Sequence, residues 1–295
     1  MEFPPEHTIG TPLRSALPPS GWAVAMRRVL ARHGLPDLGL APFATGSDVV
    51  WGTRSHVVKL THPRWSAEIE AEATLLRRMS GTLTVSVPEV VAHGAIDGWP
   101  YVVLGRLTEP SIGRVWPALT EIERRALARA LGEAVAVLHG RPAEDDGSWA
   151  GWRAECVRTV GERHAPAPLA EGASEFALRH LGPDLPLVQL HTELLHDHVL
   201  VGASDRGWRP FGLIDFADGR VGDPHYDLVA PVEFIWQGDT ACTRAFLSGL
   251  GWTPTGPRTL LAWALVHRYG SLSRSVALAP GCASLDELAE RVYGW

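Results

Sequence analysis

Residues 212–228, GLIDFADGRVGDPHYDL, carry the most specific pattern in this 295-residue chain. The segment begins as a short apolar strand that ends at Asp215, and it continues through a Gly-Asp-Pro turn. A carboxylate at the end of a buried strand is a hard oxygen ligand of the kind that Mg²⁺ prefers. We therefore expect Asp215 to bind a divalent metal, and Asp223 and Asp227 to have structural roles. Alternatively, all three aspartates only form turns.

A histidine-rich polar loop lies upstream at residues 191–198, HTELLHDH, between two apolar segments that we predict to be strands. Its Glu193 is a carboxylate with an ordinary pKa of about 4.3 and can act as a general base. A second hypothesis stays open, in which Glu193 is the base of a metal-dependent hydrolase whose metal is held by histidines and Asp215. The histidines of that hypothesis are His191, His196 and His198.

The short segment HVVKL, residues 56–60, contains the only lysine of the chain, and the other 26 basic residues are arginine. Because arginine serves a surface ion pair at least as well, Lys59 indicates a site that requires a compact ammonium group. The next segment, residues 66–80, has a serine N-cap, acidic residues early and arginines late, which predicts a helix. That helix carries Glu68, Glu70 and Glu72.

The composition excludes several classes of protein. Hydrophobic residues make up 45% of the chain and charged residues 20%, which is typical of a globular enzyme. The net charge of −6 argues against a nucleic-acid-binding protein and is compatible with a cationic ligand. Three widely spaced cysteines exclude a disulfide framework, and no apolar run approaches the roughly 18 residues that span a bilayer. Since the N-terminus lacks a signal-peptide pattern, we expect a cytoplasmic protein without a membrane partner.

The secondary-structure pattern changes near residue 105. Short strands with two amphipathic helices precede it, and mostly helices follow it. This change predicts an α+β fold with a small β-rich domain over residues 1–105 and a larger helical domain over residues 106–295. The predicted strands cover residues 38–44, 48–52, 56–60, 85–94, 99–107, 187–191, 198–202 and 211–216, the predicted helices cover residues 21–34, 66–80, 120–140, 172–182, 258–272 and 284–295, and residues 141–152 are predicted to be a polar linker.

A strand lysine, a helix glutamate, a polar loop and an Ile-Asp-Phe strand end follow one another in the order found in kinase-type phosphoryl transfer. The sequence resembles the aminoglycoside phosphotransferase family, a branch of the two-lobed protein-kinase-like fold. The family's catalytic loop reads H-G-D-x-x-x-x-N, and its metal segment reads I-D-F/W…GDPxxDLA. Here they correspond to residues 191–198 and 214–228. Within the family, the layout, including the closing SLDELAERVYGW, most resembles the streptomycete hygromycin B phosphotransferases.

The resemblance implies a role for individual positions. Lys59 would lie along the phosphates of a nucleotide, held by Glu72, which matches the phase of the family's helix, with Glu68 as the alternative. Glu193 and His191 would act in catalysis. The implied metal ligands are Asp215 and His198, the further nucleotide-binding residues are Gly46, Ser47, Gly105 and Leu107, and the substrate-binding residues are Glu193, Asp218, Glu233 and Trp236.

The implied activity is transfer of a phosphoryl group from ATP or GTP, with Mg²⁺, to a hydroxyl group of a small molecule. The implied acceptor is a cationic antibiotic, aminoglycoside-like or related, so that the protein would confer resistance. A metabolite kinase of the same fold and a non-catalytic nucleotide-binding protein stay open as alternatives. The non-catalytic alternative rests on Glu193 and His198, which replace the family's aspartate and asparagine. The extra methylene of Glu193 moves its carboxylate by about 1 Å, and such a displacement can lower a rate about 10²-fold.

Overall fold

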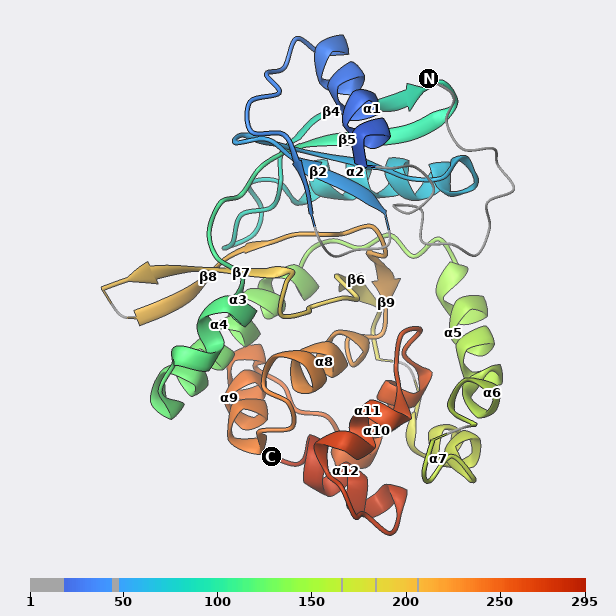
Figure 1. The fold of residues 1–295 in the computed structure, drawn as a ribbon. Coiled ribbons are helices and arrows are strands. Elements are labelled where there is room, and N and C mark those ends of the chain that lie inside the picture. Colours follow the sequence, from blue (N-terminus) through green and yellow to red (C-terminus); the bar gives the residue numbers. More distant parts are fainter. Residues whose placement is uncertain (1–18, 44–47, 166, 184, 206) are drawn as a thin grey trace. The chain divides into compact units, whose positions relative to one another are not determined.

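The computed structural model describes residues 19–43, 48–165, 167–183, 185–205 and 207–295 (Figure 1). The chain divides into two compact units. Unit 1 comprises Met1–Thr82, Ser86–Thr108 and Ile214–Asp218, and unit 2 comprises Leu83–Val85, Glu109–Leu213 and Gly219–Trp295. The domain boundary predicted from the sequence lies between residues 105 and 106, with all later residues in the second domain. The structure instead places the short segment Ile214–Asp218 in unit 1, the compact unit that contains Lys59.

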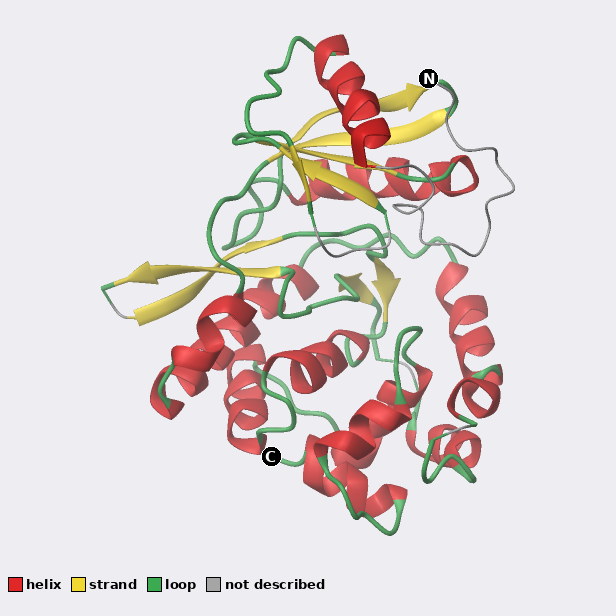
Figure 2. Cartoon of the chain, viewed as in Figure 1, coloured by secondary structure: helices red, strands yellow, loops and turns green. Residues whose placement is uncertain are grey.

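Unit 1 is a five-stranded antiparallel sheet with the strand order β1-β2-β3-β5-β4, accompanied by two main helices (Figure 2). The turn Thr53–Ser55 joins β2 to β3, and the hydroxyl group of Thr53 accepts hydrogen bonds from the backbone N–H groups of Ser55 and His56. The elements of unit 1 are α1 (Pro19–Arg32), β1 (Ala41–Pro42), β2 (Val49–Gly52), β3 (His56–Leu60), the 3₁₀ helix η2 (Pro63–Trp65), α2 (Ser66–Met79), β4 (Val90–Ile96) and β5 (Trp99–Gly105).

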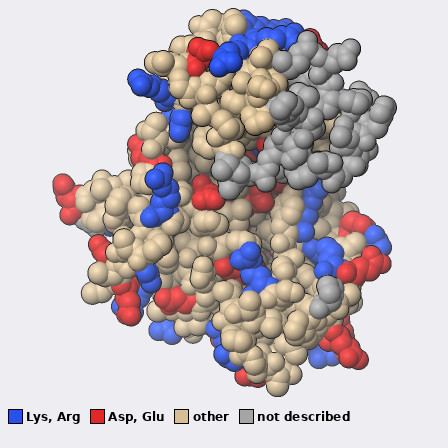
Figure 3. Space-filling view, viewed as in Figure 1, with Lys and Arg blue, Asp and Glu red and all other residues tan. Residues whose placement is uncertain are grey.

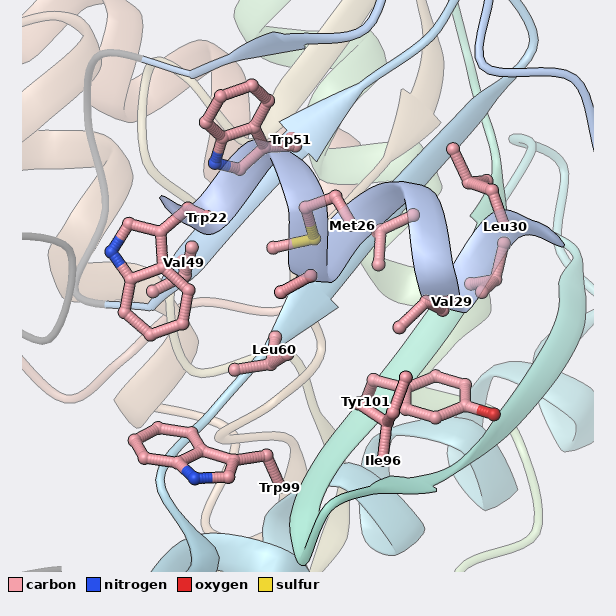
Figure 4. Close-up of a cluster of buried hydrophobic side chains, with 13 residues drawn as sticks. Trp22, Met26, Val29, Leu30, Val49, Trp51, Leu60, Ile96, Trp99 and Tyr101 are labelled. Atoms are coloured by element: carbon pink, nitrogen blue, oxygen red, sulfur yellow. The ribbon is translucent and has the colours of Figure 1, made fainter. Parts of the chain in front are cut away.

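The two faces of this sheet have different neighbours. Successive side chains of a strand point to opposite faces. On one face, Val58 and Leu60 of β3 and Tyr101 of β5 pack with Trp22 of α1 in a buried apolar cluster (Figure 4). Lys59 lies between Val58 and Leu60 in β3, and therefore projects to the opposite face.

Helix α2 has an apolar stripe that one charged residue interrupts. Ile69, Ala73 and Leu76 recur at helical spacing and are buried. Glu72 lies on the same stripe, and only 1% of it is exposed. Burying a carboxylate is unfavourable unless a partner compensates for the lost hydration. The position of Glu72 therefore requires a cation at the buried side of α2.

Unit 2 is mainly helical and also contains two two-stranded antiparallel sheets, β6–β9 and β7–β8 (Figure 1). Among the described residues, none of the helices is both long enough and apolar enough to cross a bilayer. The elements are α3 (Ile112–Val115), η3 (Trp116–Ala118), α4 (Glu121–His139), α5 (Ser148–Arg158), α6 (Val160–His164), α7 (Ala173–His180), β6 (Val188–Leu190), β7 (Val199–Ser204), β8 (Gly207–Leu213), β9 (Arg220–Gly222), α8 (Tyr226–Ala230), the π-helix η4 (Pro231–Ile235), α9 (Thr240–Leu250), α10 (Pro257–Val266), α11 (Leu272–Leu278) and α12 (Leu285–Tyr293).

The long helix α4 packs closely against α9. Thr120 and Glu123 form a capping box that starts α4, as the pattern T-x-x-E predicts. Two glycines allow the close approach of the helices: a β-carbon at Gly132 would lie 2.1 Å from the carbonyl oxygen of Phe246, and one at Gly249 would lie 2.0 Å from a carbonyl oxygen of α4. No side chain fits at either position without a shift of the helix backbone.

Several predicted elements differ from the structure. The strand predicted over residues 85–94 begins only at Val90, and the strand predicted over residues 211–216 ends at Leu213, two residues before Asp215. The N-cap of α2 is Trp65 and not the predicted serine, and no side chain caps the helix. The strand predicted over residues 38–44 is confined to β1 within the described residues. The helix predicted over residues 258–272 ends at Val266, because the ψ angle of His267 is 129° and leaves the helical region, and α11 begins only at Leu272. The predicted linker over residues 141–152 ends earlier, since α5 already begins at Ser148.

On the molecular face drawn in Figure 3, basic and acidic side chains are interspersed. The described residues visible there form no continuous basic surface of the kind that binds nucleic acid.

Candidate active site

Lys59 is surrounded by three carboxylates of unit 1. Its Nζ atom lies 3.0 Å from Oδ1 of Asp215, 3.3 Å from Oε2 of Glu72 and 3.4 Å from Oδ2 of Asp48. The lysine side chain is 9% exposed and that of Glu72 is 1% exposed, whereas that of Asp215 is 38% exposed. We call these four residues the lysine cluster. It combines a buried ion pair with a carboxylate that solvent can reach.

The register of the sheet brings Asp48 to this cluster. Strands β2 and β3 are antiparallel, with Val50 opposite Lys59 and Val49 opposite Leu60. Asp48, one residue before Val49, therefore lies opposite Thr61. The hydroxyl group of Thr61 donates a 2.7 Å hydrogen bond to Oδ1 of Asp48. None of the sequence patterns described above singles out Asp48. Counting the register outward from the three-residue turn between β2 and β3 could have found it.

Asp215 has a backbone conformation that few side chains adopt. Its φ angle is 65°, in the left-handed region. Aspartate tolerates this region better than most residues, but it still carries strain of roughly 1 kcal/mol or more. This conformation accompanies the 3.0 Å hydrogen bond that Lys59 donates to Oδ1 of Asp215. Strain at a solvent-accessible carboxylate is typical of a functional position.

The lysine cluster contains more negative than positive charge. With every group ionised, three carboxylates and one ammonium group have a formal charge of −2. Burial lowers the pKa of Lys59, but attraction by Asp215, Glu72 and Asp48 outweighs it and raises the pKa well above its usual value. The pKa of Glu72 is raised too, mainly because burial disfavours its charged form. Lys59 opposes this shift, whereas the negative charges of Asp215 and Asp48 increase it. The excess negative charge makes the cluster suitable for a bound cation.

The predicted nucleotide-binding loop and hinge are only partly described. Gly46 and Ser47 lie outside the described residues. Gly105 ends β5, and its N–H group donates a 2.8 Å hydrogen bond to the carbonyl oxygen of Glu89. The N–H group of Arg106 donates to Ser55 within the same unit. If this segment meets a nucleobase through a backbone N–H group, Leu107 is the remaining candidate.

In unit 2, Asp227 fixes the start of the histidine-rich loop. It is fully buried, and its carboxylate accepts hydrogen bonds from the backbone N–H groups of His191 at 3.0 Å and Thr192 at 2.6 Å. His139 of α4 lies 3.0 Å from the same carboxylate. Burial alone would raise the pKa of Asp227, but His139 and His191 hold it below its ordinary value. The hydrogen bonds confirm the structural role predicted for Asp227.

The loop itself is held in a tight conformation. The N–H group of Glu193 donates to Nδ1 of His191 at 3.3 Å, and Nδ1 of His198 lies 2.9 Å from the carbonyl oxygen of Glu193. If His198 binds a metal ion, it would therefore do so through Nε2. Thr192 has a φ angle of 76°, which is strained for a β-branched residue. The family motif has glycine at this position, and the left-handed backbone explains why.

The histidines of the hydrolase hypothesis have separate roles. His191 is buried and uses Nδ1 within the loop, and His198 also uses Nδ1 there. The side chain of His196 is 47% exposed, and its Nε2 lies 3.5 Å from Asp197. His191 and His198 thus both use Nδ1 within the loop, and the hydrolase hypothesis stays open.

Two of the predicted substrate-binding residues lie in the core of unit 2. Glu233, in η4, is 1% exposed, and its Oε1 accepts hydrogen bonds from the hydroxyl groups of Ser275, at 2.6 Å, and Tyr293. Trp236 is 3% exposed and donates a 3.0 Å hydrogen bond to Thr243. Their burial argues against direct contact with a substrate. Of the other two predicted substrate-binding residues, Asp218 is partly exposed and belongs to unit 1, and Glu193 lies in the histidine-rich loop.

Residues 45–263 match the model of the phosphotransferase enzyme family. Several solved structures are similar to the chain. The GDP and kanamycin complex of APH(2")-IIia is 18% identical, with a TM-score of 0.66 over 82% of this chain and 87% of that chain. The aminoglycoside phosphotransferase APH(3'')-Id from Streptomyces rimosus, in complex with ADP and streptomycin, is 18% identical, with a TM-score of 0.62 over 83% and 98%. An aminoglycoside-3'-phosphotransferase of type VIII is 21% identical, with a TM-score of 0.60 over 82% and 97%.

The structural similarities confirm the predicted α+β protein-kinase-like fold, with a small β-rich unit and a larger helical one. The family model covers more than half of the chain and includes every residue of the lysine cluster and of the histidine-rich loop. The chain therefore belongs to the phosphotransferase enzyme family.

Proposed function

We propose that this protein transfers the γ-phosphoryl group of ATP or GTP to a hydroxyl group of a small molecule. The observation that carries the proposal is the lysine cluster, in which one buried ammonium group meets three carboxylates within 3.4 Å. Kinase-type phosphoryl transfer requires a strand lysine held by a helix glutamate and a separate aspartate for the metal. Lys59, Glu72 and Asp215 supply these groups on the corresponding elements.

The donor set of the cluster fits a magnesium nucleotide. Hard carboxylate oxygens are suitable ligands for Mg²⁺, and the formal charge of −2 leaves two negative charges for a divalent cation. When bound, Mg²⁺ would neutralise charge on the phosphates of the nucleotide. Lys59 orients the phosphates, Glu72 holds the ammonium group in place, and Asp215 provides the exposed carboxylate. Leu107 is the hinge residue proposed to meet the base.

Glu193 is the proposed general base for the acceptor. The loop that carries it is rigid, because Asp227 holds its first residues and His198 holds the carbonyl oxygen of Glu193. A rigid loop favours positioning of the acceptor hydroxyl, which is the main source of catalysis in this type of reaction. In this proposal Glu193 orients the hydroxyl group and accepts its proton, His191 supports the loop, and His198 is a second metal ligand through Nε2.

The proposed acceptor is an antibiotic or a small metabolite that carries a hydroxyl group. Similar folds occur in complexes with kanamycin, gentamicin and streptomycin. These acceptors are the first candidates, and hygromycin B joins them because the layout of the sequence resembles its phosphotransferases. Transfer to one of these drugs would make the protein a resistance enzyme acting inside the cell.

The test is transfer of the radiolabelled γ-phosphate of ATP and GTP to a panel of acceptors, with and without Mg²⁺. The panel combines the four antibiotics with sugars, amino acids and choline-like amines. We expect Mg²⁺-dependent labelling of one acceptor class. In Asp215→Asn the rate of labelling should fall on the order of 10²-fold or more. Asp205→Asn, at an exposed site, is the matched control. Labelling that survives in Asp215→Asn would remove Asp215 from the mechanism.

The panel also separates the alternatives. Labelling of a metabolite and of none of the antibiotics would identify a metabolite kinase. Nucleotide binding without any labelled product, and without an effect of Glu193→Ala, would identify a non-catalytic nucleotide-binding protein.

A further inference from the structure

Three imidazole groups hold the two peptide groups on either side of Glu193, the proposed general base. His191 accepts a hydrogen bond from the N–H group of Glu193, and His198 donates one to the carbonyl oxygen of Glu193. Both histidines belong to the histidine-rich loop. The third imidazole is that of His267, whose Nε2 atom lies 3.0 Å from the carbonyl oxygen of Thr192. The peptide group between Thr192 and Glu193 is therefore held at its N–H end by the loop and at its C=O end by His267.

The contacts of His267 define its protonation state. Because a carbonyl oxygen cannot donate, Nε2 carries the hydrogen atom of the contact with Thr192. Nδ1 accepts a 3.3 Å hydrogen bond from the backbone N–H group of Tyr269. From these two contacts we assign the neutral tautomer with its hydrogen atom on Nε2. Since His267 is only 5% exposed, this ring is a buried donor directed at the loop.

The position of His267 is itself fixed within unit 2. Its N–H group donates to the carbonyl oxygen of Trp263 in α10 at 2.7 Å, and its own carbonyl oxygen accepts a 2.7 Å hydrogen bond from Arg163 of α6. Its ring stacks on that of Tyr226 in α8, with centroids 4.1 Å apart. The hydroxyl group of Tyr226 in turn accepts a 2.9 Å hydrogen bond from the backbone N–H group of Arg268. Because both the backbone and the ring of His267 are held, its Nε2–H group has a defined direction.

The peptide group that His267 holds belongs to a strained part of the loop. Thr192 has a φ angle of 76°, and Asp227 accepts a 2.6 Å hydrogen bond from its N–H group. Strained conformations persist where the surrounding groups determine them, and here hydrogen bonds act at both ends of Thr192. Glutamate has one more rotatable bond than the aspartate of the family motif, so its carboxylate has more conformational freedom. A fixed backbone at Glu193 limits this additional freedom.

From this geometry we propose that His267 is a positioning residue for phosphoryl transfer. Its Nε2–H group fixes the peptide group between Thr192 and Glu193 and thereby orients the Glu193 carboxylate toward the acceptor hydroxyl group. His267 lies outside residues 45–263, which match the family model, so the match does not include this contact. The role in positioning rests on the proposed function, whereas the hold of His267 on the loop does not depend on catalysis.

Two substitutions separate the hydrogen-bond donor from the ring. His267→Phe keeps an aromatic ring against Tyr226 and removes the donor. His267→Gln loses the ring but keeps a donor, because Nε2 is the same number of bonds from Cα in both side chains. Thr243→Val is the matched control, because Thr243 is buried in α9 and its hydroxyl group accepts a 3.0 Å hydrogen bond from Trp236. It also removes a buried side-chain hydrogen bond of unit 2, but not one of the loop.

Hydrogen–deuterium exchange of the full chain, resolved by mass spectrometry of peptides that cover the histidine-rich loop, tests the hold on the loop without any ligand. Loss of the hydrogen bond should speed exchange of the loop amides about tenfold in His267→Phe. His267→Gln and Thr243→Val should exchange there within about twofold of the wild type. Unchanged loop exchange in His267→Phe would overturn the proposal, and so would equally fast exchange in His267→Gln. Faster exchange of α4 as well in His267→Phe would indicate a general loss of stability and would also overturn it.

Steady-state kinetics test the positioning of the base. The acceptors are kanamycin, gentamicin, streptomycin, hygromycin B and the metabolites of the panel. With the acceptor that the wild type labels, His267→Phe should lower kcat about tenfold or more while the KM for ATP stays within about twofold. His267→Gln should recover most of the lost kcat, and Thr243→Val should keep the wild-type kcat. A general loss of folded protein would not produce this recovery by a donor without a ring.

The two measurements separate this inference from the proposed function. A wild type that labels an acceptor, with the same kcat in His267→Phe, would support the kinase and refute the positioning role. A wild type that labels no acceptor of the panel, with loop exchange that still depends on the donor at residue 267, would refute the kinase. His267 would then hold the loop without positioning a base, and this result would overturn the catalytic part of the inference.

Discussion

Replacing Glu72 by glutamine should have an unusual effect on stability. Removing one partner of a buried ion pair commonly costs about 3–5 kcal/mol. Here, however, Lys59 keeps Asp215 at 3.0 Å and Asp48 at 3.4 Å. The substitution also removes a buried charge and reduces the formal charge of the cluster from −2 to −1. Glu72→Gln should therefore change the free energy of unfolding by no more than about 1 kcal/mol in either direction.

Replacing Lys59 by methionine should have the opposite effect. At 3.3 Å and an effective dielectric constant of about 20, the attraction between Lys59 and Glu72 is about 5 kcal/mol. Without the lysine, three carboxylates remain together and none has its cation. We expect Lys59→Met to lower the free energy of unfolding by about 3–5 kcal/mol at pH 7, the range for an uncompensated buried charge.

The pH dependence has a definite sign. The pKa of Glu72 is raised in the folded protein, so the folded state binds a proton above the usual glutamate pKa of about 4.5. The contribution of Glu72 to stability is fully present below that value and is lost as the pH rises through the folded-state pKa. The destabilisation in Lys59→Met should therefore be smaller at pH 5 than at pH 7, because Glu72 can take up a proton.

Urea denaturation of the wild type, Glu72→Gln and Lys59→Met at pH 5 and pH 7 measures these differences. Glu70→Gln is the matched control, because Glu70 lies two residues earlier in α2 with 62% of its side chain exposed. It should change the free energy of unfolding by less than about 0.5 kcal/mol. Destabilisation of Glu72→Gln by as much as Lys59→Met would refute the argument that the cluster carries excess negative charge.

Three other substitutions follow from the geometry. Gly249→Ala places a β-carbon 2.0 Å from a backbone oxygen of α4 and should lower the free energy of unfolding by about 1–3 kcal/mol. Its control is Gly151→Ala in α5, where the β-carbon meets open space; this variant should be neutral or stabilising in the same denaturation assay. Thr192→Gly should raise the melting temperature, because it relieves a left-handed backbone strain of about 1 kcal/mol; a lower melting temperature would argue against strain. Asp48→Asn should lower kcat for phosphoryl transfer about tenfold with little change in stability, because Lys59 then loses one of three partners; an unchanged kcat would make Asp48 a purely structural residue.

Much of the lysine cluster could be predicted from the sequence. A lone lysine between apolar residues and a glutamate on the apolar stripe of a helix are local patterns that residue type and periodicity reveal. The segment around Asp215 is recognisable because strand, turn and aspartates occur at fixed spacing. Asp48 could also be predicted, because the short turn between β2 and β3 fixes the register of the two strands.

The remaining features depend on how distant segments pack. One cavity of unit 2 is lined by residues of α5, α6 and β9 together with Arg268, and no local sequence pattern connects these segments. The family resemblance implies substrate contacts for Glu233 and Trp236. In the structure, Glu233 is buried in the π-helix η4, and Trp236 packs against Phe246 of α9. The apolar residues around them in PVEFIW correctly indicate a buried segment.

Thermal stability with ATP or GTP, in the presence and absence of Mg²⁺, tests the lysine cluster most directly. At a nucleotide concentration about 100 times its Kd, binding should add roughly 2.7 kcal/mol to the stability of the wild type. This stabilisation should require Mg²⁺ and should be much smaller in Lys59→Arg, whose longer, planar guanidinium group cannot replace the ammonium group between Glu72 and a phosphate. No Mg²⁺-dependent stabilisation of the wild type by either nucleotide, or equal stabilisation of Lys59→Arg, would contradict the proposed function of the cluster.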